Sequence, residues 1–174
     1  VMKGDSAGDN LGSSVSLSSN GTRVAMGATY NDGNGTDSGH VKVCEYSSGS
    51  WTQLGTDIDG EAAGDRSGYS VSLSSNGSIV AIGAIYNDGG SNPNNNRGQV
   101  RVYEYKIPSQ AQWNITDYWD RPDGYVLKGD DAGNANPTSN TKYWVKLGDD
   151  RDLDGFSGSE SGYSVSLSSN GSIV

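Results

Sequence analysis

The stretch SGYSVSLSSNGSIV occurs twice without a mismatch, at residues 67–80 and at residues 161–174. Its central part, VSLSSNG, occurs a third time, starting at Val15. The copies that start at Val15 and Val71 are 56 residues apart, and the copy at Val165 follows after a further 94 residues. A sequence that repeats in this way is built from copies of one structural unit, so the repeat decides the architecture.

Each repeat predicts four short strands and no helix. Residues 70–74 alternate polar and apolar side chains, which is typical of a strand with one buried face. Asn76 and Gly77 follow, and because both residue types tolerate positive φ, they predict a type I′ hairpin turn. The strands expected in the second repeat are residues 70–74, 79–86, 99–105 and one that begins at Trp144. Trp51 marks the fourth strand of the first repeat, and the fold class is therefore all-β.

The side chains grow in size along each unit, from Ser, Val and Leu through Ala, Gly and Ile to Tyr and Trp. Blades of a β-propeller need this gradient, because they converge at the central axis and splay apart at the rim. Four strands every 40–60 residues also suit radial blades. The pattern therefore favours a β-propeller over a plain β-solenoid.

The repeated glycines resemble a known signature. Leu11-Gly12, Val15 and Gly27-Ala28 resemble the FG…GAP motif of FG-GAP repeats, the integrin α-like β-propeller family. The second copy has Ser67-Gly68, Val71 and Gly83-Ala84, whereas Thr29 and Ile85 stand where the family has proline. The resemblance implies a propeller of about seven blades, of which this chain would hold two and a fraction, each blade a four-stranded antiparallel sheet.

The expected organisation has five parts. They are residues 1–57, a first repeat whose register is truncated at its N-terminus; residues 58–105, the first three strands of a second blade; residues 106–143, an aromatic-rich insertion; residues 144–160, the fourth strand and an inter-blade loop; and residues 161–174, the start of a third blade. We interpret the chain, which opens at Val1 without a signal peptide, as a fragment. A fragment of this kind leaves blade faces without neighbours, which predicts self-association.

Composition and charge limit the kinds of partner that we expect the chain to bind. The net charge of −9 repels nucleic-acid phosphates, so we expect no DNA or RNA binding. No run of about 18 apolar residues is present, so we expect no membrane insertion. The resemblance implies an extracellular or cell-surface location.

Two loops are candidates for calcium. The family holds the ion between the first two strands of a blade in a run resembling DxDxDG, but this chain has Ser18-Ser19-Asn20-Gly21 there, so that site does not carry over. Asp150, Asp152 and Asp154 do fit DxDxDG, although Gly158 stands where the ninth-position Asp would be. These three aspartates are either a calcium site or a solvated inter-blade loop.

Catalysis has little support, and we expect no enzyme. The only histidine, His40, precedes a strand, and its counterpart in the next repeat is Gln99. We expect it at a surface edge. A Ser/His/Asp catalytic set needs a histidine in the site, so no such set is expected. The only cysteine, Cys44, takes the place of Tyr103 and is interpreted as an ordinary strand residue.

The insertion is the most individual part of the chain. Its aromatic residues, with the one at its return to the repeat, are Trp113, Tyr118, Trp119, Tyr125 and Tyr143. Aromatic faces of this kind stack on sugar rings or anchor a protein partner. The alternative is that they form a small private core that keeps a long loop folded.

Three hypotheses of function follow. The first is a non-catalytic extracellular or cell-surface propeller for adhesion or ligand binding, with a protein or a glycan as its ligand. The second is a propeller domain that accompanies a secreted enzyme. The third is a carbohydrate-binding, lectin-like module that acts through the aromatic insertion.

Overall fold

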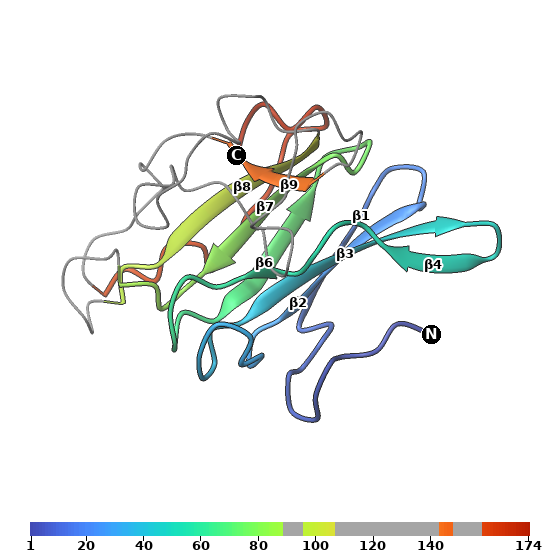
Figure 1. The fold of residues 1–174 in the computed structure, drawn as a ribbon. Coiled ribbons are helices and arrows are strands. Elements are labelled where there is room, and N and C mark those ends of the chain that lie inside the picture. The colour runs from blue at the N-terminus through green and yellow to red at the C-terminus, as the bar shows by residue number, and fades with distance from the viewer. Residues whose placement is uncertain (89–95, 107–142, 148–157) are drawn as a thin grey trace, which may run out of the picture.

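The computed structural model describes residues 1–88, 96–106, 143–147 and 158–174. Within these residues every regular element is a β-strand (Figure 1). The expectation of an all-β chain is confirmed for this part of the protein. Among the same residues there is no helix long and apolar enough to cross a membrane.

The first sheet is an antiparallel meander of four consecutive strands, joined by a short fifth one. Its strands are β1 (Ser14–Leu17), β2 (Arg23–Ala28), β3 (His40–Ser47), β4 (Ser50–Gln53) and β5 (Ile58–Asp59). β5 pairs with the first residues of β3, so β4 and β5 follow one another along the same edge of that strand. The second unit was expected to begin at Ile58, but Ile58 lies in this first sheet.

The second sheet repeats the meander in the same register. It consists of β6 (Ser67–Leu73), β7 (Ile79–Ala84), β8 (Gln99–Lys106) and β9 (Tyr143–Lys146). Tyr105 pairs with Trp144 in this sheet as Tyr46 pairs with Trp51 in the first. The predicted correspondence between the two repeats is therefore confirmed down to individual strand pairs.

The hairpin turns lie where the sequence predicts them, but the turn type was wrong. Asn20 does not adopt positive φ, whereas Gly21 does, at 68°. The side-chain oxygen of Asn20 accepts hydrogen bonds from the backbone N–H of Thr22 (3.0 Å) and from the hydroxyl of Ser18 (2.9 Å). Asn20 thus acts as a local cap, which short amide side chains favour in turns. The same contacts recur at Asn76 and Asn170.

A pair of consecutive residues with positive φ lies instead at the β3–β4 hairpin. Ser48 and Gly49, between β3 and β4, have φ values of 52° and 85°. Two consecutive residues of positive φ are the mark of a type I′ turn, whose twist matches that of the strands it joins.

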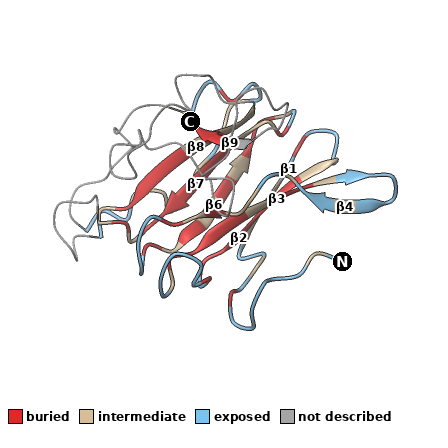
Figure 2. Ribbon diagram, viewed as in Figure 1, coloured by how far each residue is buried: buried red, intermediate tan, exposed pale blue. Residues whose placement is uncertain are grey.

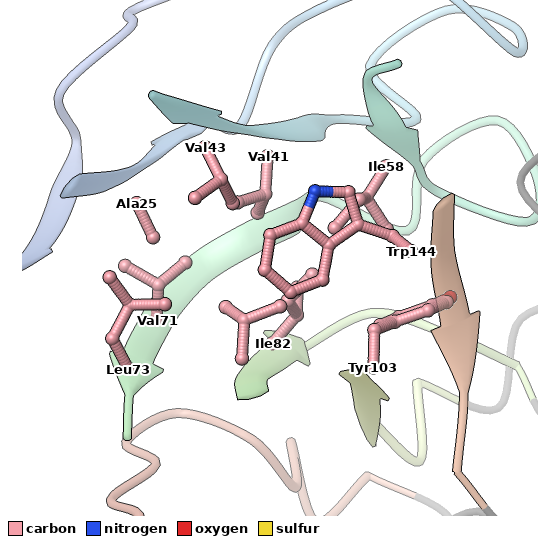
Figure 3. Close-up of a cluster of buried hydrophobic side chains, with 10 residues drawn as sticks. Ala25, Val41, Val43, Ile58, Val71, Leu73, Ile82, Tyr103 and Trp144 are labelled. Atoms are coloured by element: carbon pink, nitrogen blue, oxygen red, sulfur yellow. The ribbon is translucent and has the colours of Figure 1, made fainter. Parts of the chain in front are cut away.

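The two sheets pack face to face and bury a shared core (Figures 1 and 2). Figure 3 shows side chains of both sheets pointing into the same space. The buried residues of this cluster are Ala25, Val41, Val43 and Ile58 from the first sheet and Val71, Leu73, Val80, Ile82, Tyr103 and Trp144 from the second. The indole N–H of Trp144 donates to the carbonyl of Leu54 at 2.9 Å, so the largest core side chain also bridges the sheets.

The contacts between neighbouring units are themselves repeated. The hydroxyl of Ser14 donates to the carbonyl of Gly68 at 2.7 Å, and the hydroxyl of Ser70 donates to the carbonyl of Gly162 at 2.7 Å. The segment from residue 158 to residue 174 therefore rests on the second sheet as the second sheet rests on the first.

Candidate functional site

An acidic hollow of about 360 Å³ lies at one end of the first sheet. Three stretches of chain meet there: the segment before β1, the loop after β2, and the connection between β4 and β5. The residues that line the hollow are Asp5, Ser6, Asp9, Asn31, Asp32, Gly33, Asp57 and Asp59. Five of the eight are aspartates, which gives the hollow a strongly negative potential.

Part of the wall is fixed by hydrogen bonds. Asp9 is buried and accepts from the side-chain amide of Asn31 at 2.9 Å and from the backbone N–H of Ser6 at 3.0 Å. The second repeat builds the same motif, in which Asp65 accepts from Asn87 at 2.9 Å. The recurrence identifies Asp9 as a structural residue that holds the loop after β2.

His40 lies beside the hollow with only 1% of its surface exposed. Its Nδ1 atom is 3.6 Å from Oδ2 of Asp57, 4.0 Å from Oδ2 of Asp5 and 4.0 Å from Oδ1 of Asp59. The expectation that His40 lies at a surface edge was therefore wrong. It is buried because it pairs with Ala28 of β2 on one side and with Asp59 of β5 on the other.

Two of these carboxylates are held by their other oxygen. The ammonium group of Lys42 donates to Oδ1 of Asp5 at 2.6 Å and lies 3.6 Å from Oδ1 of Asp57. The side-chain amide of Gln53 also donates to Oδ1 of Asp57, at 2.7 Å. Both carboxylates consequently turn their Oδ2 atoms toward the imidazole ring of His40.

The charge states follow from these surroundings. Burial lowers the pKa of His40, and the attraction of Asp57 offsets only part of that effect, so the ring is neutral at pH 7. The hydrogen bond from Lys42 lowers the pKa of Asp5. Burial acts to lower the pKa of Lys42, but its contacts with Asp5 and Asp57 outweigh this and raise it. The site therefore combines a neutral imidazole with the ionised carboxylate of Asp5.

The second repeat has a different set of residues at the same positions. Gln99, which is 4% exposed, takes the place of His40, and Glu61 takes the place of Asp5. Arg101 stands where the first sheet has Lys42 and lies 3.4 Å from Glu61. Among the described residues, the imidazole-centred arrangement therefore belongs to the first sheet.

The structure does not describe most of the residues singled out in the sequence. Trp113, Tyr118, Trp119, Tyr125, Asp150, Asp152 and Asp154 lie outside the described residues. Tyr143 is the first residue of β9, opposite Lys106 of β8. The structure thus neither assembles nor separates these candidates.

The residues that do form a site carried a signal in the sequence. Counted from the paired tryptophans, Asp57 and Asp59 are the counterparts of Asp150 and Asp152. The first repeat has only Asp57-Ile58-Asp59-Gly60-Glu61 at this place, which fits DxDxDG less well than the later copy, and His40 is expected at the surface, so the sequence does not predict the combination. Cys44 behaves as expected: it is buried in β3, and burial raises the pKa of its thiol.

Comparisons with known proteins leave the family open. The sequence matches no model of a known protein family. It also matches none of the curated proteins. The resemblance to FG-GAP repeats therefore stays a prediction that rests on the residues quoted above.

Proposed function

We propose that this chain is a non-catalytic binding module, built from blades of a seven-bladed FG-GAP-like β-propeller and used outside the cell or on its surface. Two observations support the propeller: antiparallel four-stranded sheets of identical register, and unit-to-unit contacts that recur from the first pair of units to the second. A constant contact between successive units is how repeat proteins generate a regular curve.

The observation that carries the binding role is the acidic hollow. It concentrates five aspartates on a scaffold of paired strands, and the chain has a net charge of −9. Such a concavity attracts positively charged groups and steers their approach. We propose that the ligand is a basic segment of a protein partner, whose Lys or Arg side chains enter the hollow.

The geometry supports binding rather than catalysis. His40 is the chain's only histidine, and its burial keeps the ring from direct contact with a bulky substrate. Cys44 is buried, and its raised thiol pKa disfavours the reactive thiolate. The imidazole of His40 and the thiol of Cys44, the groups best suited to acid–base and nucleophilic catalysis, are therefore both buried.

Binding of a fluorescently labelled hexalysine peptide, measured by anisotropy in the presence of a chelator, tests this proposal. The variant Asp32→Lys reverses an exposed charge in the hollow, and Glu160→Lys makes the same change in charge outside it. We expect Asp32→Lys to weaken binding at least ten-fold and Glu160→Lys to weaken it less than three-fold. Equal effects of the two variants would mean that the net charge of the chain alone attracts the peptide. That result would overturn the proposal that the hollow is the binding site.

A further inference from the structure

The imidazole of His40 is a buried polar group without a hydrogen bond. The ring is 1% exposed, Nε2 is buried without a partner among the described residues, and Nδ1 has no acceptor within hydrogen-bond distance. A neutral imidazole carries its proton on one nitrogen and a lone pair on the other. If the proton is on Nδ1, the lone pair of Nε2 is buried without a donor among the described residues; if it is on Nε2, the lone pair of Nδ1 points at carboxylate oxygens, and a cation between them would stabilise that arrangement.

The carboxylates around the ring are arranged as ligands with a supporting shell. Lys42 and Gln53 hold the Oδ1 atoms of Asp5 and Asp57, and the Oδ2 atoms of both face Nδ1. Ligating carboxylates in metal sites are likewise held by hydrogen bonds from surrounding residues, which fix the orientation of the free oxygen. Lys42 therefore need not leave for a cation to enter.

We infer that Asp5, His40 and Asp57 bind a divalent transition-metal ion, for which zinc is the best fit. One ligand atom from each of these residues lies within 4.8 Å of the others. Zn–N and Zn–O bonds are about 2.0–2.2 Å long, so two tetrahedral ligand atoms lie roughly 3.4 Å apart. The distances of 3.6 Å and 4.0 Å from Nδ1 to the two Oδ2 atoms are only slightly longer.

The mixed donor set selects the type of ion. Calcium and magnesium prefer oxygen ligands alone, whereas one imidazole with carboxylates suits zinc. Asp59 lies 4.0 Å from Nδ1 but outside the group of three mutually close ligand atoms, so the proposed ligands are Asp5, His40 and Asp57. This inference goes beyond the proposed function, because the metal site does not depend on a basic protein ligand.

Isothermal titration of the chelator-treated 174-residue chain with ZnCl₂ at pH 7.5 tests the site. We expect one zinc ion per chain and a much weaker response to CaCl₂. The variant His40→Gln copies Gln99, which the second repeat tolerates at the same buried position. We expect this variant to lose at least ten-fold in zinc affinity, with its fold checked by circular dichroism.

Two control variants separate this site from other zinc ligands. Glu160→Gln removes an exposed carboxylate outside the hollow, and Cys44→Ser removes the only thiol. Both should bind zinc within three-fold of the parent chain. Loading with Co²⁺ should give a visible absorption band in the parent and in both controls, and that band should be absent in His40→Gln.

The outcomes also distinguish this inference from the proposed function. Absence of zinc binding in the parent chain, or undiminished binding in His40→Gln, would overturn the metal site. Neither result would bear on the binding of hexalysine, which is measured in the presence of a chelator. Conversely, zinc binding without any peptide binding would keep the metal site and remove the proposal of a basic protein ligand.

Discussion

Gly27 lies directly against the backbone carbonyl of Gly68, so that a methyl group at Gly27 would overlap that oxygen. The two glycines belong to neighbouring sheets, and the hydroxyl of Ser14 donates to the same carbonyl at 2.7 Å. Gly83 and Gly162 repeat this relationship one unit later. The close approach requires the absence of a side chain, which explains why glycine recurs at this point of the repeat.

The first prediction follows from this contact. Gly27→Ala should destabilise the chain by about 1–3 kcal/mol, because the added methyl group must push two backbones apart. Gly4→Ala is the matched control, since the nearest atom to a methyl group there is 3.5 Å away. Urea unfolding followed by tryptophan fluorescence measures both. A loss no larger for Gly27→Ala than for Gly4→Ala would contradict the packing of the sheets.

The second prediction compares the two tryptophans at equivalent strand positions. Trp144 is 2% exposed in the shared core and donates to Leu54, whereas Trp51 is partly exposed on a smaller cluster. Trp144→Ala should cost about 3–5 kcal/mol of unfolding free energy, as large core truncations do. Trp51→Ala should cost less than half as much, and equal costs in thermal or urea unfolding would argue against the core described here.

The third prediction concerns pH. Burial lowers the pKa of His40 in the folded chain, whereas the unfolded chain titrates near 6.5. As pH falls below about 6.5, His40 therefore binds a proton in the unfolded chain but not in the folded chain. The free energy of unfolding then falls by up to about 1.4 kcal/mol per pH unit. Above that pH both states are neutral, and this contribution to the pH dependence vanishes.

Urea unfolding in chelator at pH 7.5 and pH 5.5 checks this effect. The parent chain should lose more stability between the two conditions than His40→Gln does. Asp65 has a raised pKa because of burial, and its contribution has the opposite sign, but it is present in both proteins and cancels in the comparison. Identical pH profiles for the two proteins would show that His40 is not the titrating group.

The fourth prediction concerns self-association. Val15 and Leu17 of β1 are 56% and 58% exposed, whereas their counterparts Val71 and Leu73 are 9% and 7% exposed under the first sheet. We expect the 174-residue chain to associate at high concentration through this open apolar face. Leu17→Ser should reduce the association, whereas Tyr46→Ser, an exposed residue near the opposite edge of the sheet, should not. Static light scattering across a concentration series would contradict this idea if the parent chain stays monomeric throughout.

The repeat made much of the fold predictable. Because side chains in a strand alternate with a period of two, aligning Val15 with Val71 predicted equivalent strand pairing in both sheets, although only Val71 is buried in the core. Trp51 and Trp144 then identified the fourth strands although 37 extra residues precede the fourth strand in the second repeat. The turns were located for the same reason, but the capping role of Asn20 depends on side-chain hydrogen bonds that a preference for Asn-Gly does not specify.

The candidate site was less predictable, because it depends on contacts between distant segments. Asp5, His40 and Asp57 come from three separate stretches, and only the return of β5 to the edge of β3 brings them together. β5 is two residues long, too short to leave a periodic pattern in the sequence. The sequence consequently predicts that a histidine at the start of a strand is exposed, whereas the pairing with β5 buries His40.

The repeated contact between units also bears on how such a chain diversifies. Each unit recognises its neighbour through serine hydroxyls and backbone carbonyls, as Ser14 with Gly68 and Ser70 with Gly162 show. This part of the contact depends on no distinctive side chain of the neighbour, whereas the core beside it does, through residues such as Trp144. Units that keep the serine, the glycines and the core residues can therefore be duplicated or given a new insertion while their exposed loops acquire different chemistry.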